Sequence, residues 1–179
     1  MPSIYLIRHE EPEMRGRFIG RTDPPLTAAG RLAAAAKLGA LEVASIYVSP
    51  LRRARQTAEA IRTLAAPMVV DELAEIHFGE WEGLTWQEIE LRWPNTACRK
   101  VEDWLGVTAP GGESWADFCV RVECALRRVL AGPRPAAVVA HMVVNAALAA
   151  RLMGADPKRF HQEYGEVLPC EAPDSHPQF

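Results

Sequence analysis

The stretch SIYLIRHEEPE, residues 3–13, decides the fold because it joins a buried strand to a group of charged side chains. Its four apolar residues, 4–7, have the length and composition of a strand in the core of a sheet. Arg8 and His9 follow directly, and two glutamates come after them. A core strand that ends on a cation and an imidazole indicates that its carboxyl end forms part of a polar site.

Three further runs have strand-like composition, and helix-like segments separate all four. This alternation predicts an α/β domain, a three-layer sandwich with a mostly parallel central sheet flanked by helices. With 179 residues, 49% of them hydrophobic, the chain is large enough for one core. We expect a single domain over residues 1–170, a loop-rich cap insertion around 84–112 and a flexible tail over 171–179. The strand-like runs are residues 4–7, 45–48, 68–70 and 136–140.

Capping residues predict where the helices begin. Thr27 is a candidate N-cap for an alanine-rich helix, and Ser49 followed by proline is typical of the start of a second helix, LRRARQTAEAIRTL. Ser114 and Asp117 resemble a capping box that opens a third helix. A final helix is expected from about residue 143 to residue 153, before a glycine.

The composition favours a small-molecule partner. The formal charge is -3 and the charged residues are interspersed, so no basic face suits nucleic acid. No apolar segment approaches the ~20 residues that span a bilayer, and the amino terminus lacks a signal peptide, so we expect a cytoplasmic protein without a membrane partner. The four cysteines form no CxxC pair and are expected to be free thiols. Whether the chain forms a homodimer is left open.

Polar side chains follow the ends of the predicted strands. Arg8 and His9 follow the first strand, Arg53 opens the helix after the second, Glu75 follows the third, and His141 ends the fourth. Because ligands gather at the carboxyl ends of parallel strands, these side chains should meet at one edge of the sheet. Each alone has an ordinary structural explanation, such as a solvated helix face or a hydrogen-bonded core histidine. The inference depends on all of them arriving at equivalent positions.

Together these residue types predict a phosphoryl-transfer site without a metal or an organic cofactor. A neutral imidazole is a competent nucleophile near neutral pH, and arginine binds phosphate oxygens with a charge that burial does not remove. A carboxyl group can protonate the leaving alkoxide. A helix that begins after His141 would add backbone N–H donors aimed at the same anion.

The sequence resembles the histidine phosphatase superfamily, in its phosphoglycerate-mutase-like branch, over about residues 4–154. The resemblance implies the phosphoglycerate mutase-like fold, a phosphohistidine on His9, and a phosphoryl group held by Arg8, Arg53 and His141. Glu75 falls where the family places its proton donor, so the expected catalytic residues are His9, Glu75 and His141. The matching motifs are LIRHEEP, TDPPLTAAG, SPLRRARQTAEAI, LAEIHFGEWEG and VVAH.

Two residues depart from the family's pattern: Glu10 and Met142 stand where a glycine usually follows each histidine. A Glu10 carboxylate about 4 to 6 Å from phosphate would cost about 3 to 4 kcal/mol at an effective dielectric near 20. It would also favour a protonated His9, which cannot attack. If Glu10 instead points away and binds a cation or a helix terminus, little is lost. The sequence leaves both orientations open.

Further positions are weaker matches. Glu80 and Glu82 lie in the loop that adjoins the predicted proton donor and are kept as second candidates. Arg52 is one residue off the usual register of the second arginine. The family often carries a small polar residue, commonly asparagine, after the signature, and three arginines supply cations in that region here: Arg15, Arg17 and Arg21.

The resemblance is strongest to the branch that includes α-ribazole phosphatases, whereas broad-specificity sugar-phosphate phosphatases share many of the same motifs. Trp81, Trp86 and Trp104 suit stacking on a flat ring such as a benzimidazole, although packing beneath loops explains them equally well. Glu113 falls at a position where members of the family line the substrate pocket. The expected substrate-binding residues are Arg8, Arg53, Arg21, Met142, Trp81 and Glu113.

Other interpretations make different predictions. A phosphate-binding or regulatory module of the same fold would bind without turnover, with Glu10 and Met142 recording lost catalysis. A phosphoglycerate-mutase-type phosphotransferase is disfavoured because the long insertions of those relatives are missing. A metal-dependent hydrolase lacks HExxH or another compact ligand spacing, and a nucleotide-binding protein lacks GxxxxGK[ST] and GxGxxG.

Overall fold

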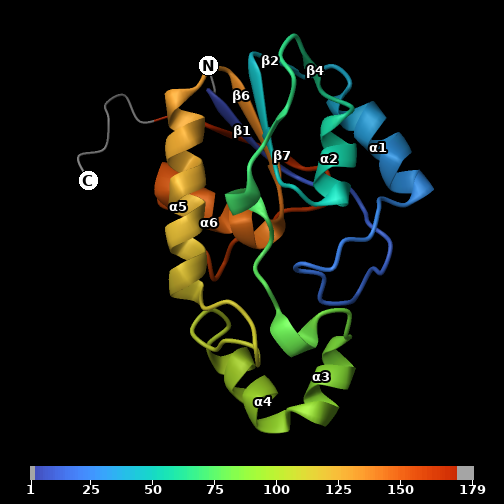
Figure 1. The fold of residues 1–179 in the computed structure, drawn as a ribbon, viewed down its shortest axis with the longest axis vertical. Coiled ribbons are helices and arrows are strands. Elements are labelled where there is room, and N and C mark those ends of the chain that lie inside the picture. Colours follow the sequence, from blue (N-terminus) through green and yellow to red (C-terminus); the bar gives the residue numbers. More distant parts are fainter. Residues whose placement is uncertain (1–2, 173–179) are drawn as a thin grey trace.

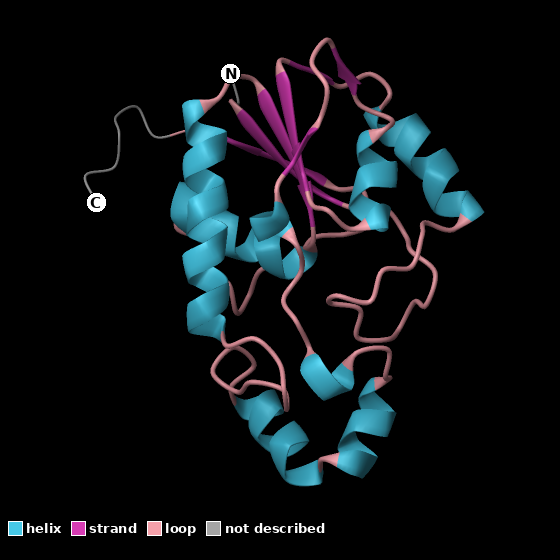
Figure 2. Cartoon of the chain, viewed as in Figure 1, coloured by secondary structure: helices cyan, strands magenta, loops and turns pink. Residues whose placement is uncertain are grey.

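The computed structural model describes residues 3–172 and confirms the α/β three-layer architecture (Figures 1 and 2). A five-stranded sheet in the order β5-β3-β6-β1-β7 forms the middle layer. Its first four strands pair in parallel and include all four predicted runs, whereas β7 pairs antiparallel to β1 at the edge. The strands are β1 (Ile4–Arg8), β3 (Ser45–Val48), β5 (Met68–Val69), β6 (Ala136–Ala140) and β7 (Val167–Cys170).

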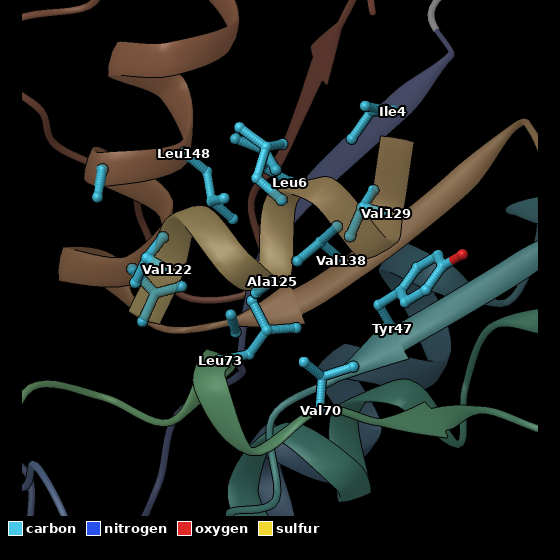
Figure 3. Packing of buried hydrophobic residues seen from close by; sticks show 14 of the residues in the cluster. Ile4, Leu6, Tyr47, Val70, Leu73, Val122, Ala125, Val129, Val138 and Leu148 are labelled. Atoms are coloured by element: carbon cyan, nitrogen blue, oxygen red, sulfur yellow. The ribbon is translucent and has the colours of Figure 1, made fainter. Parts of the chain in front are cut away.

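Helices cover both faces of the sheet because alternate residues of each strand point to opposite sides. Ile4 and Leu6 of β1 pack on one side with the helices α5 (Trp115–Ala131) and α6 (Met142–Met153), as Figure 3 shows for this larger cluster. Ile7 packs on the other side with α1 (Ala28–Leu38) and α2 (Arg52–Ala58). The sheet is therefore buried on both faces, which explains the continuously apolar strands.

Three of the predicted helix boundaries are confirmed. Thr27 caps α1, where its side chain accepts a hydrogen bond from the backbone N–H of Gly30 at 2.9 Å. Ser114 caps α5 by accepting from the backbone N–H of Asp117 at 3.1 Å. The helix α6 begins at Met142 and ends at Met153, before Gly154, whose φ of 68° is the left-handed conformation that favours glycine.

The second predicted helix is much shorter than expected. Ser49 does not cap it, because α2 begins at Arg52 and the Ser49 hydroxyl is buried in other contacts. The helix ends at Ala58, and the following segment forms a short parallel pair, β2 (Glu42–Val43) with β4 (Arg62–Thr63). Tertiary pairing here overrides the helical propensity of the segment.

The region 84–112 contains two helices rather than loops laid over the sheet. The helices α3 (Trp86–Arg92) and α4 (Pro94–Glu102) project beyond the sheet, at the bottom of Figure 1. A capping box of Thr85 and Glu88 starts α3, and Pro94 occupies the first turn of α4. Two short 3₁₀ helices, Asp71–Leu73 and Gly79–Trp81, lead into this region.

The carboxyl-terminal part of the chain returns to the sheet. β7 was not expected, because VLPC contains a proline and follows an irregular segment; the edge position tolerates Pro169. Residues 173–179 of the expected tail lie outside the described residues. Within residues 3–172, no helix is long and apolar enough to cross a membrane.

Candidate active site

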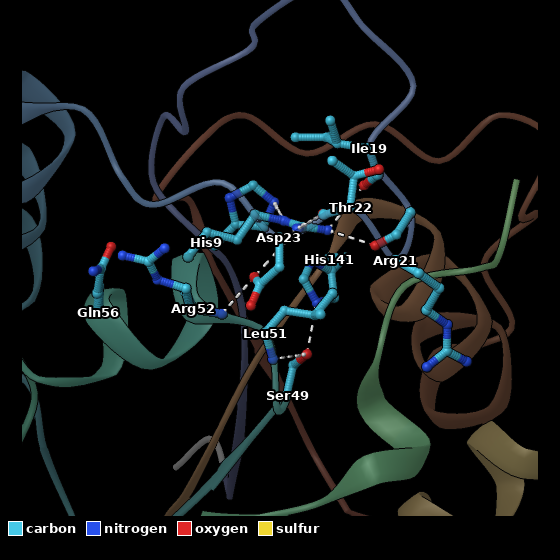
Figure 4. A network of polar contacts seen from close by, with 12 residues as sticks. His9, Ile19, Arg21, Thr22, Asp23, Ser49, Leu51, Arg52, Gln56 and His141 are labelled. Atoms are coloured by element: carbon cyan, nitrogen blue, oxygen red, sulfur yellow. Dashed lines mark hydrogen bonds and ion pairs between the residues drawn. The ribbon is translucent and has the colours of Figure 1, made fainter. Parts of the chain in front are cut away.

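The register of the central strands brings the two predicted histidines together. Arg8 of β1 pairs with Ala140 of β6, so His9 and His141 leave neighbouring parallel strands at the same level. Their ring centroids lie 5.1 Å apart, and both side chains are buried. Figure 4 shows the two rings in one network of polar contacts, with the loop of Thr22 and Asp23 close by.

The contacts of His9 define which nitrogen can react. His9 Nδ1 lies 2.7 Å from the backbone carbonyl oxygen of Glu10, which can only accept, so Nδ1 carries the proton. His9 Nε2 then has a lone pair, and it accepts a hydrogen bond from Arg53 Nε at 3.2 Å. Burial, followed by the charge of Arg53, holds the pKa of His9 well below its usual value. The ring is therefore neutral and nucleophilic at neutral pH.

Backbone carbonyl groups fix the guanidinium of Arg53. This side chain is fully buried, and it donates to the carbonyl oxygens of Thr22 at 2.9 Å, Ile19 at 2.9 Å and Gly20 at 3.0 Å. Burial lowers the pKa of Arg53, and the nearby carboxylates, Glu75 foremost, oppose that effect. Arginine keeps its charge in such surroundings, so the site holds a permanent cation next to His9 Nε2.

Glu82 holds the loop that carries these carbonyl groups. Its carboxylate accepts hydrogen bonds from the backbone N–H groups of Gly20, Arg21 and Thr22 and from the Thr22 hydroxyl at 2.6 Å. Burial on its own raises the pKa of Glu82, but these hydrogen bonds outweigh it, and the pKa is lowered. Glu82 is therefore an ionised structural residue beneath the loop and a poor proton donor.

The contacts of His141 leave one nitrogen available to an anion. The Ser49 hydroxyl oxygen accepts from the backbone N–H of Leu51 at 3.3 Å, and its O–H can donate to His141 Nε2, 2.7 Å away. In the neutral tautomer that accepts this hydrogen bond, His141 Nδ1 carries the single ring proton. Nδ1 is buried and has no hydrogen-bond partner among residues 3–172. An unpaired buried donor beside His9 is suited to a phosphoryl oxygen.

Glu75 is a carboxyl group that can carry a proton. It is 6% exposed, and its oxygens accept from the backbone N–H groups of Ile76 at 3.0 Å and of Val143, in the first turn of α6, at 3.3 Å. Burial raises the pKa of Glu75, and these two hydrogen bonds reduce the rise without cancelling it. A buried carboxyl group with a raised pKa is the type of residue that acts as a general acid.

A cavity of about 290 Å³ reaches part of this group of residues, whereas Arg53 and His141 are not in its lining. His9 and Glu75 line the same cavity, which is the arrangement required for one to attack and the other to protonate the leaving group. Arg8 lines it too, and its Nη1 donates to the carbonyl oxygen of Gln162 at 2.6 Å. Aromatic rings form much of the remaining wall: Phe18, Phe78, Trp86, Trp104 and Tyr164.

Comparison with known proteins agrees with this geometry. The model of the histidine phosphatase superfamily, branch 1, matches residues 4–172. The chain belongs to this superfamily. This family member is 33% identical over 169 residues to phosphoserine phosphatase 1 from Hydrogenobacter thermophilus, covering 89% of this chain and 80% of that protein. Its fold is similar to that of the solved α-ribazole phosphatase from Shigella flexneri, with a TM-score of 0.80, 25% identity, and 92% and 88% of the two chains covered.

A third relative is a longer protein. The chain is 38% identical over 144 residues to a bifunctional protein from Mycobacterium tuberculosis, and the match covers 76% of this chain and 39% of that protein. The histidine phosphatase domain therefore spans well under half the length of the first curated relatives that it matches. Other matching relatives are named as phosphatases or as a phosphoglycerate mutase.

Some of the predicted substrate-binding residues do not reach the cavity of this superfamily member. Trp81 is fully buried in a cluster with Ile89, so its ring cannot stack on a substrate. Glu113 forms a two-point ion pair with Arg121, at 2.6 and 2.7 Å. Arg21 is outside the cavity lining, as are the predicted Arg53 and His141, which lie behind His9, whereas the predicted Arg8 and Met142 belong to it.

The remaining candidates from the sequence have other partners. Arg17 lines the cavity, but Glu88 and the carbonyl oxygen of Gly83 hold its guanidinium. Arg15 is paired with Glu11 at the surface. Glu80 is exposed, as is Arg52, which lies next to the buried Arg53.

Sequence reasoning missed two residues of the site. The Ser49 hydroxyl lies 2.7 Å from His141 Nε2, and Tyr164 lines the cavity with its ring centroid 4.0 Å from Arg8 Cζ. The position of Ser49 could have indicated its role, because it directly follows a strand and precedes the helix that contains Arg53. Tyr164 carried none, because it lies in an irregular segment far along the chain from its partners.

Proposed function

We propose that this chain is a phosphomonoesterase that forms a phosphohistidine on His9 and requires no metal. The observation that carries the proposal is the anchored His9 ring, with Nδ1 on a backbone carbonyl group and Nε2 beside Arg53 at the cavity. A fixed, neutral nucleophile next to a permanent cation is what phosphoryl transfer to nitrogen requires. Arg8, Arg53 and His141 supply the donors for the phosphoryl oxygens.

The first half-reaction transfers the phosphoryl group to the enzyme. The lone pair of His9 Nε2 attacks phosphorus, the bond from phosphorus to the ester oxygen breaks, and Glu75 donates its proton to the leaving alkoxide. The product is a phosphohistidine. Its Nδ1 keeps its proton and still donates it to the carbonyl oxygen of Glu10. Arg53 Nε, which contacts Nε2 in the free enzyme, then donates to a phosphoryl oxygen.

The second half-reaction releases phosphate. The ionised Glu75 accepts a proton from water as the water oxygen attacks phosphorus. The bond between phosphorus and Nε2 breaks, and its electron pair returns to nitrogen. Inorganic phosphate leaves, His9 is again neutral, and Glu75 is again protonated.

The cavity wall favours a leaving alcohol with a flat ring. Trp86 and Trp104 line the cavity together with Phe18 and Phe78, and Trp104 is 40% exposed. Such rings stack on planar groups. We therefore propose α-ribazole 5'-phosphate as the first natural substrate to test, in line with the name of the Shigella relative, and sugar phosphates as the second class.

One observation argues against the alternative of an impaired phosphate-binding module. Glu10 does not line the cavity, and its carboxylate lies against Lys37, which favours the orientation of Glu10 that leaves catalysis intact. Mutase-type phosphotransfer to a second substrate remains the competing outcome.

Over residues 3–172, no group of three or more His, Cys, Asp or Glu side chains is placed to hold a metal ion. The four free thiols are in line with a cytoplasmic setting.

Steady-state hydrolysis of p-nitrophenyl phosphate, with chelator present and His9→Ala in parallel, tests the proposal. We expect phosphate release by the wild type alone, with and without chelator. Activity that the chelator abolishes would contradict a metal-independent reaction, and equal activity of His9→Ala would contradict the nucleophile. A matched panel of α-ribazole phosphate, phosphoserine and sugar phosphates then ranks substrates by kcat/KM. Transfer of the phosphoryl group to an added acceptor alcohol in preference to water would identify a mutase-type enzyme.

A further inference from the structure

Glu10 follows the nucleophile directly, yet its carboxylate turns away from the cavity towards α1. Glu10 Oε1 lies 2.7 Å from Lys37 Nζ, and the Glu10 side chain is 3% exposed, against 48% for Lys37. Glu10 Oε2 also lies 3.3 Å from the backbone nitrogen of Glu11, which donates to it. The buried carboxylate therefore depends on one lysine for its compensating charge.

The same lysine also holds a wall of the cavity. Lys37 Nζ donates to the backbone carbonyl oxygen of Tyr164 at 2.7 Å. The Tyr164 ring covers Arg8, with 4.0 Å between its centroid and Arg8 Cζ, and its centroid lies 5.7 Å from that of His9. One ammonium group thus joins α1, the residue after the nucleophile, and the segment that carries a cavity residue.

The backbone next to Tyr164 packs closely against Arg8 and Glu10. Gly165 has φ of 66°, and its N–H donates to the carbonyl oxygen of Arg8 at 3.1 Å. A Cβ at Gly165 would overlap the carboxylate of Glu10. Glycine is needed here both for the left-handed conformation and for the contact with Glu10.

We propose that Glu10 and Lys37 form a clamp that positions Tyr164 over Arg8 and His9, and that Tyr164 contacts the bound phosphate ester. This proposal rests on the proposed function, because the phosphate ester is its ligand. Glu10 and Lys37 are positioning residues, since they act through Tyr164 and the backbone. Tyr164 is the residue that contacts substrate, and its ring keeps the Arg8 guanidinium in place by a cation–π contact.

The clamp is tested with Lys37→Met, Glu10→Gln and the double variant, and Arg62→Met serves as the control because Arg62 is an exposed cation paired with Glu42 at 3.8 Å. Lys37→Met leaves a buried unpaired carboxylate, so both Tm and kcat/KM should fall. The double variant removes that charge and should recover Tm. Its kcat/KM should stay about tenfold below wild type, mostly through KM, because Tyr164 is no longer held. Arg62→Met should match the wild type in both.

Binding of inorganic phosphate, measured by calorimetry, separates failure of the clamp from failure of the proposed function. The phosphate Kd should rise in the double variant and in Tyr164→Leu, and it should stay near the wild-type value in Lys37→Arg. That comparison holds even if the wild type hydrolyses no ester, a result that would contradict the proposed function alone. A double variant with recovered Tm and unchanged KM and phosphate Kd would show that the pair only stabilises the fold, and would overturn the clamp.

Discussion

Replacement of Ser49 by alanine should reduce phosphate binding without removing any group that touches phosphate. The Ser49 hydroxyl lies 2.7 Å from His141 Nε2. If it donates there, the single proton of the neutral ring is on Nδ1, where it can bind a phosphoryl oxygen. Ser49→Ala leaves Nε2 without a partner in a buried site. The ring can then carry its proton on Nε2, so that Nδ1 presents a lone pair to the anion.

The size of this effect follows from the one hydrogen bond that sets the tautomer. A buried hydrogen bond of this kind contributes about 1 to 2 kcal/mol, which corresponds to a decrease of about 5- to 30-fold in kcat/KM. The assay is steady-state hydrolysis of p-nitrophenyl phosphate, combined with nitrogen-15 NMR of the histidine side chains to read the protonated nitrogen of His141. Ser45→Ala is the matched control, because Ser45 begins the strand that Ser49 follows and its exposed hydroxyl donates to the carbonyl oxygen of Pro133. Wild-type kcat/KM with an unchanged His141 tautomer in Ser49→Ala would refute the reasoning.

Three further predictions concern pH, the arginine and the aromatic wall. Turnover needs neutral His9 and protonated Glu75; with ordinary pKa values of 6.5 and 4.5, only about 1% of molecules would have both at pH 5.5. Because burial lowers the first pKa and raises the second, we expect kcat/KM to fall below the lowered pKa of His9 and above the raised pKa of Glu75. A pH profile of Glu75→Gln should lack the alkaline limb, whereas Glu80→Gln should keep it; an alkaline limb in Glu75→Gln would assign it to another group. Arg53→Lys should lower kcat/KM by about 100-fold or more and the free energy of unfolding by about 2 to 4 kcal/mol, since three carbonyl oxygens lose donors, and Arg52→Lys should do neither. Trp104→Ala should raise KM for p-nitrophenyl phosphate by about 5-fold, from about 1 kcal/mol of lost stacking, and leave KM for glycerol phosphate unchanged; an equal rise for both esters would argue against stacking.

The sequence predicted the parts of the fold that depend on local composition. The four parallel strands are short apolar runs, and Thr27, Ser114 and Gly154 mark helix ends through side chains or conformations that act locally. The short α2 was missed because the residues after Ala58 pair with β2, and that pairing is a tertiary event. The helix α3 could have been found, because Thr85 and Glu88 have the spacing of a capping box.

The sequence could predict only those residues of the site that follow the ends of the parallel strands. His9 and His141 were expected at one edge because each ends a parallel strand, and the register confirms that they meet. Whether Glu10 faces phosphate depends on Lys37, a residue of α1 that the sequence gives no reason to place beside it. The role of Ser49 needs His141, which only the pairing of β3 with β6 brings near.

Trapping of the phosphoenzyme tests the central claim most directly. The wild type is mixed with p-nitrophenyl phosphate, quenched in alkali during the first turnover, digested and analysed by mass spectrometry. The account predicts a burst of p-nitrophenol and an acid-labile phosphoryl group on the peptide that contains His9, with both lost in His9→Ala. Continued phosphate release without any phosphorylated peptide, or a phosphoryl group on another residue, would contradict it.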